Sequence, residues 1–382
     1  MTAPITILGT GLAGYNLARE LRKQDPDAPL RIISADSGDF YSKPMLSTGF
    51  ASKKTANQLV MKPAEKMAEE LKAELLTATR VLTIDVSQRC LYTDKGEFAY
   101  DKLVLALGAD TFKPMLAGDA ADTVLSVNDI ADYAQFRHQV EGRQRIVLLG
   151  AGLIGCEFAH DLVVSGRQVT VIDLAGWPLS RLLPEQAGRY LQEKLAGLGV
   201  QFQLGAMATA LDRHGEGLLL TLADGAQLAA DLVMSAIGLQ PRIALAKQAG
   251  LAVGRGILVD RYLQSSAPHI YALGDCAEVD GQLLPYVLPI MQAARALAAS
   301  LTGKQTAVVY PAMPVVVKTP ICPTVISPPA HGALGDWQFE RRDNGLRALF
   351  TTPDDRLLGF ALLGDATAER QALVTHLPAV LV

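Results

Sequence analysis

The sequence predicts an α/β fold made of two similar units, followed by a small α+β domain. Three observations support this prediction. A strand followed by a glycine-rich turn occurs at 5–14, the same pattern returns at 145–159, and a proline-rich, extended stretch begins near Tyr310. Hydrophobic residues form 49% and charged residues 19% of the 382 residues, a composition that suits the well-buried strands of parallel sheets.

The first unit opens with the segment ITILGTGLAG. The apolar run at 5–8 predicts a buried parallel strand, and a helical pattern is present at 17–22. Between them lie three glycines with the spacing Gly-x-Gly-x-x-Gly: Gly9, Gly11 and Gly14. In a dinucleotide-binding loop the first glycine allows the tight turn, the second admits the pyrophosphate, and the third lets helix and strand pack closely. Asp36, after the next strand, could accept hydrogen bonds from a ribose, but an ordinary α/β turn with a capping aspartate has the same local pattern.

The second unit repeats the whole pattern, which favours nucleotide binding over an ordinary turn. Its glycines are Gly150, Gly152 and Gly155. The following strand, RQVTVID, ends at Asp173. Two complete Rossmann-like units imply two dinucleotides, and the economical pair is a flavin in one unit and a nicotinamide cofactor in the other. We expect NADH rather than NADPH because Asp173 would bind a free ribose 2′-hydroxyl and repel a 2′-phosphate, although Arg181 lies nearby in sequence.

Each unit also contains a closing strand and an inserted hairpin. DKLVLALGA at 101–109 and ADLVMSAIGLQPR at 230–242 predict buried strands that end at a glycine. The segments RCLYTDKGEFAY and GLLLTLADGAQLAA contain apolar–polar alternation and the turn signals KG and DG. We therefore expect a parallel sheet with an inserted β-meander in each unit.

The stretch at 256–276 adds a further strand, IYALGD, which ends at Asp275. The carboxylate of Asp275 either accepts hydrogen bonds from a ribityl chain or only closes a turn. Pro289 predicts the start of a helix that runs to about Thr302 and ends near Gly303. If this helix begins beside the flavin, its N-terminus would stabilise negative charge on the reduced ring.

The C-terminal part predicts a small α+β domain. The alternation at 335–366 predicts antiparallel strands with turns at Asn344-Gly345 and Asp354-Asp355, and a helix is expected after Thr367. The expected domains are 1–111 (FAD-binding, first part), 112–241 (NAD-binding), 242–308 (FAD-binding, second part) and 309–382 (C-terminal α+β).

Composition and charge argue against several other classes of protein. A net charge of −4 without a basic cluster interleaved with aromatics argues against nucleic-acid binding. No apolar run has spanning length and the N-terminus has no leader pattern, so we expect a cytoplasmic protein without membrane insertion. The six histidines show no metal-ligand spacing, and no metal is expected. The four cysteines form no Cys-x-x-Cys pair, and we expect buried thiols at Cys90, Cys156, Cys276 and Cys322.

Over its full length the chain resembles FAD-dependent oxidoreductases of the pyridine nucleotide-disulphide type. More narrowly, it is similar to the reductases of single-electron carriers: rubredoxin, flavorubredoxin and ferredoxin reductases. The matching stretches are GTGLAGYNLARE, YSKPMLSTGF, LLGAGLIGCEFA, AIGLQPR, HIYALGDCAE and MPVVVKTP. YSKPMLS and VKTP resemble the NADH:rubredoxin reductases in particular. That family passes electrons from NADH through FAD to rubredoxin, a small acidic iron–sulphur protein, often in support of alkane hydroxylation.

The resemblance also implies roles for individual residues. The FAD pyrophosphate and adenosine ribose would be held by Asp36 and by the first glycine loop: Gly9, Thr10, Gly11, Leu12, Ala13 and Gly14. Around the rest of FAD, the resemblance places Lys43 by the flavin, the Val81 backbone at the adenine, Asp275 at the ribityl chain, Val287 beside the ring, and Lys318 reaching it from the C-terminal domain. Glu157 would lie near the nicotinamide–flavin contact. NAD would be bound by Gly150, Gly152, Gly155, Asp173 and Gly238. Flavin N5 would be the reactive centre, and no side chain is expected to act as an acid or a base.

One departure from the family concerns the partner of Glu157. Many relatives have a lysine directly after LS that can pair with this glutamate, but Thr48 occupies the position here. The resemblance therefore requires Lys318 or Lys43 to take that place. Peroxide- and oxygen-reducing relatives have a reactive cysteine at the same point, and disulphide reductases have a cysteine pair near the first loop. Thr48 argues against the first kind of centre, and the absence of a cysteine pair near the first loop argues against the second.

The function expected from the sequence is a rubredoxin–NAD(+) reductase that uses FAD. The alternatives are a flavorubredoxin or ferredoxin reductase, an NADH oxidase, and a flavin-binding redox sensor that does not turn over. A monomer is expected because the long dimerisation segment of disulphide reductases has no counterpart here. A basic docking rim for the acidic partner could include Lys53, Lys54 and Lys62, although a solvated face is the simpler interpretation of these lysines.

Overall fold

A five-stranded parallel sheet forms the centre of the first unit in the computed structural model, which describes residues 3–382. In the order β20-β9-β1-β2-β5, its strands are Ile270–Ala272, Lys102–Leu105, Ile5–Leu8, Leu30–Ile33 and Glu74–Leu76. All four residues of β1 are buried, as the apolar run predicts for a strand that is covered on both faces.

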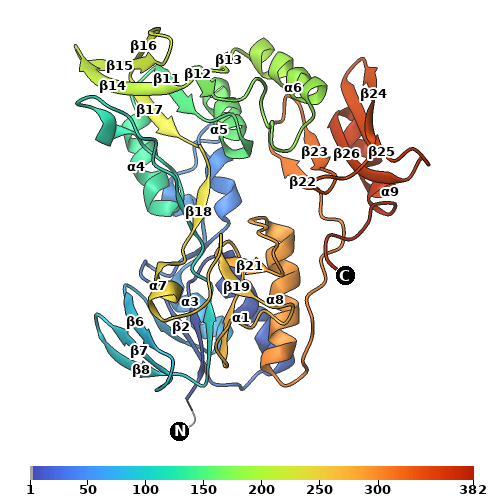
Figure 1. Cartoon of the computed structure of the whole chain (residues 1–382). Helices are drawn as coiled ribbons and strands as arrows, with labels where there is room; N and C mark the ends of the chain where they lie inside the picture. Colours follow the sequence, from blue (N-terminus) through green and yellow to red (C-terminus); the bar gives the residue numbers. More distant parts are fainter. Residues whose placement is uncertain (1–2) are drawn as a thin grey trace.

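Two long helices pack against each other beside this sheet (Figure 1). Helix α1 spans Leu12–Gln24 and therefore begins directly after Gly11, five residues before the predicted helical pattern. Helix α8 spans Val287–Leu301 and begins two residues before Pro289. The early start is possible because the first backbone N–H groups of a helix have no intrahelical partner, so proline loses nothing there.

The remaining elements of the first unit surround the sheet. The predicted meander is present as β6 (Val81–Asp85), β7 (Cys90–Thr93) and β8 (Gly96–Ala99), with the turn at Asp94 and Lys95. The other elements are β3 (Phe40–Tyr41), the 3-10 helix η1 (Lys43–Thr48), α2 (Ala56–Leu59), β4 (Val60–Lys62), α3 (Ala64–Leu71), α7 (Ala244–Gln248), β19 (Ile257–Val259) and β21 (Ala277–Val279).

The second unit has a four-stranded parallel sheet in the order β13-β12-β11-β17. Its strands are Gln201–Leu204, Gln168–Asp173, Arg145–Leu149 and Leu232–Ser235. Its helices are α4 (Ile130–Val140), α5 (Leu153–Val164) and α6 (Glu185–Leu198), with η2 at Ala121–Thr123. The predicted hairpin lies within a three-stranded meander of β14 (Ala208–His214), β15 (Gly217–Leu222) and β16 (Gln227–Ala230).

Two short strands connect the units where the chain passes between them. β10 (Ala109–Thr111) and β18 (Leu239–Pro241) pair antiparallel, and Arg242 Nη2 lies 2.7 Å from Asp110 Oδ1 beside this pair. The domain limits expected after residues 111 and 241 fall at the ends of these strands, and the domain assignment itself stays a prediction.

The C-terminal domain is a five-stranded antiparallel sheet in the order β22-β23-β26-β25-β24. Its strands are Val315–Val317, Thr324–Ser327, Leu357–Gly364, Gly345–Thr351 and Asp336–Arg342. They are followed by η3 (Asp365–Glu369) and α9 (Arg370–Val374), close to the predicted helix. Helix α6 of the second unit packs against β25 and β26 (Figure 1). Arg341 reinforces this contact through an ion pair of 2.9 Å with Glu193.

The two ends of the C-terminal domain meet at Tyr310. The Tyr310 N–H donates to Leu381 O at 2.8 Å, and the Val380 N–H donates to Tyr310 O at 2.8 Å. Tyr310 itself is 3% exposed and belongs to the hydrophobic core of the first unit. The chain thus leaves the first unit and returns to it at one residue.

Candidate functional site

The first glycine loop is shaped by two different constraints. Gly9 has φ +117°, and a Cβ there would lie 2.3 Å from Ala106 O. A Cβ on Gly14 would lie 2.0 Å from Gly9 O, so both positions require glycine for packing alone. Gly11 differs, because a Cβ there would meet no protein atom within 4 Å. Its lack of a side chain leaves room beside the α1 N-terminus, which fits the close approach of a pyrophosphate.

The three glycines of the second loop are constrained in the same way as those of the first. Gly150 has φ +106° with a Cβ position 2.6 Å from Ala236 O, and a Cβ on Gly155 would lie 1.9 Å from Gly150 O. Gly152, like Gly11, has no protein atom within 4 Å of its Cβ position. Gly238 lies two residues after Ala236, with φ +128°, and its carbonyl accepts the Phe112 N–H at 3.1 Å. These residues fit a second dinucleotide.

The two acidic residues of the motifs are held differently. Asp173 ends β12, and its carboxylate accepts the N–H groups of Ala151 at 2.5 Å and Ala175 at 2.7 Å, which fixes it against the second loop. Asp36 lies three residues beyond β2. Its Oδ1 accepts the Thr10 hydroxyl at 3.2 Å, the Gly38 N–H at 2.9 Å and the hydroxyl of Ser34 at 2.5 Å.

Ser34 was missed by the sequence interpretation. It directly follows β2, is buried, and lies 2.8 Å from the Thr10 hydroxyl. A hydroxyl at the first position after the strand is the only sequence signal that points to it.

Glu157 is the most deeply buried charged group of the site, with no exposed surface. Lys318 Nζ lies 2.9 Å from its Oε2, the Lys318 N–H donates to Oε1 at 2.9 Å, and the Ser47 hydroxyl donates to Oε2 at 2.5 Å. Lys318 Nζ also donates to Pro44 O and to Ser47 Oγ. Of the two lysines that could replace the one missing at Thr48, the structure places Lys318 in this role. Ser47 is a further residue that sequence reasoning missed.

Lys43 lies in a separate polar cluster. Its Nζ donates to Asn128 Oδ1 at 2.7 Å, and Asn128 Nδ2 donates to Ala109 O at 2.8 Å. Burial lowers the pKa of Lys43 and raises the pKa of Asp275, and the attraction between the two charges partly offsets both effects. Asn128 comes from the second unit and had no signal in the sequence. Through Asn128, Lys43 of the first unit is therefore linked to Ala109, the first residue of the connecting strand β10.

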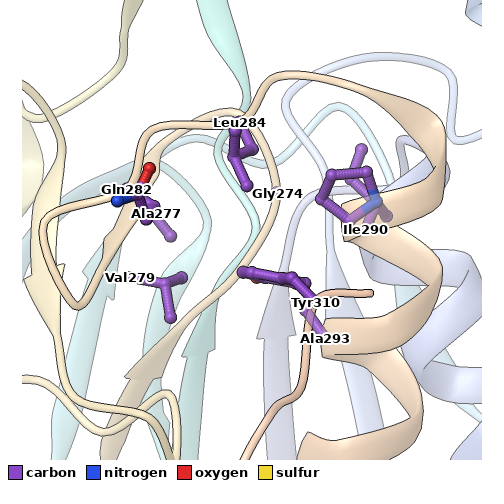
Figure 2. A pocket seen from close by; sticks show the side chains of 9 residues that line it. Gly274, Ala277, Val279, Gln282, Leu284, Ile290, Ala293 and Tyr310 are labelled. Atoms are coloured by element: carbon purple, nitrogen blue, oxygen red, sulfur yellow. The ribbon is translucent and has the colours of Figure 1, made fainter. Parts of the chain in front are cut away.

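The turn that carries Asp275 packs directly on the first loop. Gly274 has φ +81°, and a Cβ there would lie 2.7 Å from Ala13 Cβ. Behind the turn, Gly274, Ile290 and Tyr310 line a cavity of about 10 Å³, room for about one water molecule (Figure 2). Burial raises the pKa of Tyr310 to about 12, so its hydroxyl stays protonated at neutral pH. A larger cavity of about 320 Å³ lies between α4 and the β14–β15 hairpin and includes none of the predicted site residues.

The two valines predicted at the FAD site lie at the start of their elements. Val81 is the first residue of β6, pairs with Thr93, and packs against the core of the first unit. Val287 is the first residue of α8 and is 41% exposed. Of the lysines considered for docking, Lys62 pairs with Glu70, and the docking role of Lys53, Lys54 and Lys62 stays a prediction.

All four cysteines lie within residues 3–382 and are free. Cys156, Cys276 and Cys322 are buried as expected, whereas Cys90, the first residue of β7, is only partly buried. Burial raises the pKa of Cys276 and of Cys322 to about 11, which keeps both thiols protonated. No group of three or more His, Cys, Asp or Glu side chains in this range could hold a metal ion. None of its helices combines the length and hydropathy needed to cross a membrane.

The fold and the paired loops agree with the family comparison. The chain belongs to the pyridine nucleotide-disulphide oxidoreductases, whose family model matches residues 3–300. A second model, described as a rubredoxin binding C-terminal domain, matches residues 307–377. These matches confirm the predicted fold class and family.

The chain is also similar to individual proteins over nearly its full length. The chain is 51% identical to a rubredoxin-NAD(+) reductase of Alcanivorax borkumensis over 99% of both chains. It is 43% identical to a nitric oxide reductase FlRd-NAD(+) reductase of Aeromonas salmonicida, over 98% of this chain and 96% of that protein. Among solved structures, a ferredoxin reductase from Rhodopseudomonas palustris superposes with a TM-score of 0.89 at 27% identity, covering 99% and 96% of the two chains.

Proposed function

We propose that the protein is a rubredoxin–NAD(+) reductase, which transfers electrons from NADH through FAD to rubredoxin. The observation that supports this most directly is the combination of two complete dinucleotide loops with a C-terminal domain that matches the rubredoxin-binding model. The 51% identity to a rubredoxin-NAD(+) reductase over nearly the whole chain supports the same acceptor.

In this proposal the first unit holds FAD. The loop from Gly9 to Gly14 would bind the pyrophosphate and Asp36 the adenosine ribose, with the Val81 backbone at the adenine. The remaining proposed FAD residues are Lys43, Glu157, Asp275, Val287 and Lys318. When bound, FAD supplies the chemistry that protein side chains lack: it accepts a hydride and releases electrons singly. The positive charges of Lys43 and Lys318 and the N-terminus of α8 would stabilise the negative charge of the reduced state.

The second unit would hold NADH. Gly150, Gly152 and Gly155 would admit the pyrophosphate, Gly238 would line the same site, and Asp173 would accept the ribose 2′-hydroxyl. Asp173 is already fixed by two backbone N–H groups, so its negative charge would disfavour the 2′-phosphate of NADPH. We therefore propose NADH as the preferred donor.

Glu157 would orient the nicotinamide beside the flavin. Its carboxylate is held by a lysine side chain, a backbone N–H and a serine hydroxyl, so its position is fixed before any ligand binds. No proton transfer is assigned to it, because hydride transfer requires contact geometry rather than an acid or a base.

The test is the rate of NADH oxidation by the purified yellow protein with and without rubredoxin, with NADPH as the control donor. A large increase on adding rubredoxin, with NADH only, is expected. The 43% identity to an FlRd-NAD(+) reductase favours flavorubredoxin as the second candidate acceptor, and it is assayed in parallel. Equal rates with and without either acceptor would overturn the electron-carrier assignment in favour of an oxidase or a redox sensor.

We propose a monomer without nucleic-acid or membrane partners, and size-exclusion chromatography with light scattering tests the oligomeric state. A cytoplasmic location suits a consumer of NADH that keeps buried free thiols. Support of an alkane hydroxylase stays a prediction of the resemblance, and growth of a deletion strain on an alkane would test it.

A further inference from the structure

Helix α5 carries three buried polar side chains within little more than one turn. Glu157, His160 and Asp161 are 0%, 8% and 5% exposed. Glu157 has a place in the proposed function, whereas His160 and Asp161 have none so far. Because buried polar groups are expensive unless they are paired, the partners of these two residues indicate what they do.

Asp161 binds the backbone just after η1, at the end of the segment that runs from Lys43 to Ala51. Its Oδ2 accepts the N–H of Phe50 at 2.8 Å and the N–H of Ala51 at 3.2 Å. The same segment contains Ser47, which donates to Glu157. Two carboxylates on α5 therefore hold one segment of the first unit at two points.

His160 binds the segment that contains Lys318. Its Nε2 accepts the Ile321 N–H at 3.3 Å, so the ring is neutral and its own proton lies on Nδ1. Ile321 lies in a tight turn in which the Cys322 N–H donates to Thr319 O and the Thr319 hydroxyl donates to Cys322 O, both at 2.8 Å. Since the turn is internally bonded, holding Ile321 also restrains Lys318.

We propose that His160 and Asp161 are positioning residues for the reaction. They hold the segments that contain Lys43 and Lys318 in a fixed position relative to Glu157. The inference rests on the proposed function, because it assigns the segments to the site of hydride transfer. Helix α5 begins at Leu153, directly after Gly152 of the second loop. One helix thereby joins the NADH loop, Glu157, and segments from the first unit and the C-terminal domain.

Conservative and disruptive variants of each residue test this inference. His160→Gln keeps an acceptor oxygen near the position of Nε2, whereas His160→Phe keeps the ring without an acceptor. Asp161→Asn keeps one oxygen for both N–H groups, since both donate to Oδ2, whereas Asp161→Ala removes it. Leu162→Ala is the matched control, because Leu162 is a fully buried apolar residue on the same helix.

Two readouts are taken on the purified holoenzymes. Hydrogen exchange of peptides covering 318–322 and 47–52 reports the restraint directly, and stopped-flow absorbance gives the rate constant of flavin reduction by NADH together with the NADH Kd. We expect His160→Phe to accelerate exchange in 318–322 by about tenfold, as for loss of one buried hydrogen bond. Asp161→Ala should accelerate exchange in 47–52 by at least as much, because it removes the acceptor of two N–H groups. The reduction rate constant should fall by about tenfold with little change in the NADH Kd.

The controls separate positioning from simple stabilisation. His160→Gln and Asp161→Asn should restore most of both readouts, and Leu162→Ala should lower the Tm while leaving the reduction rate unchanged. Unchanged exchange and reduction in the disruptive variants, or equal loss in Leu162→Ala, would overturn the inference. If His160→Phe does not yield folded holoenzyme, His160→Leu replaces it with the same criteria. Failure of the wild-type protein to be reduced by NADH would overturn the proposed function instead.

Discussion

The two glycine loops have nearly the same backbone and different surroundings. In both, a Cβ on the first or third glycine would collide with a backbone carbonyl, and the second glycine faces no protein atom. The difference begins two residues after the third glycine. Asn16 donates to Leu12 O within its own helix, whereas Glu157 needs Lys318 from the C-terminal domain. The motif thus reproduces the phosphate-binding backbone, and the neighbouring residues determine what each unit is connected to.

The largest effect is expected from removing the ion pair between Glu157 of the second unit and Lys318 of the C-terminal domain. Lys318→Met leaves the Glu157 carboxylate buried without a cation and should lower the free energy of unfolding by about 3 kcal/mol, measured by urea denaturation. Asn16→Ala, at the equivalent position of the first unit, should cost less than about 1 kcal/mol.

A double variant checks that the loss arises from the buried charge. Glu157→Gln combined with Lys318→Met should recover most of the stability, and Arg341→Met, which removes an exposed ion pair, should change it by less than about 1 kcal/mol. Equal destabilisation of the single and double variants would contradict this explanation.

The next prediction is that a bulky residue in one glycine loop impairs only the cofactor proposed for that loop. Gly14→Val and Gly155→Val each force a side chain into a backbone carbonyl, at a cost of about 1–3 kcal/mol from overpacking. Gly14→Val should be purified without FAD, whereas Gly155→Val should stay yellow but be reduced by NADH only slowly. Absorbance at flavin wavelengths and stopped-flow reduction measure the two outcomes. Loss of FAD from both variants would show that the loops do not act separately.

A smaller effect concerns the two acidic residues. Asp173→Asn removes a negative charge fixed against the second loop, and the ratio of kcat/KM for NADH to that for NADPH should fall by about tenfold. Asp36→Asn, in the first unit, should leave this ratio unchanged. A similar fall of this ratio in both variants would contradict the proposal that only the second unit binds the nicotinamide cofactor.

The smallest effect is a pH dependence that arises from α5. Burial lowers the pKa of His160 in the folded protein below its ordinary value of about 6.5. In the window between the two pKa values the unfolded state binds more protons, so stability should decrease as the pH falls through 6.5 toward the folded-state pKa. The difference in unfolding free energy between wild type and His160→Gln should show this slope, and a difference that does not vary with pH would refute it.

The sequence could predict what depends on local pattern. Both glycine loops, their strands and the C-terminal antiparallel strands follow from apolar runs and turn residues. Predictions were weaker at element ends: α1 begins at Leu12, because Gly11 already has the extended conformation of a helix N-cap. The roles of Asn128, His160 and Asp161 depend on contacts with segments far away in the chain, which no local pattern reveals. For the same reason the sequence left Lys43 and Lys318 as equal candidates, and only the packing of the C-terminal domain separates them.

The pairing of Tyr310 with Leu381 has a mechanical consequence. A domain attached by one strand can pivot on it, whereas a domain whose entry and exit strands are bonded together is held at two points and resists rotation. The C-terminal domain is held in this second way at its base, and by α5 and α6 along its side. An approaching electron carrier would therefore meet a surface that is already in place, and little of the association free energy would be spent on ordering it.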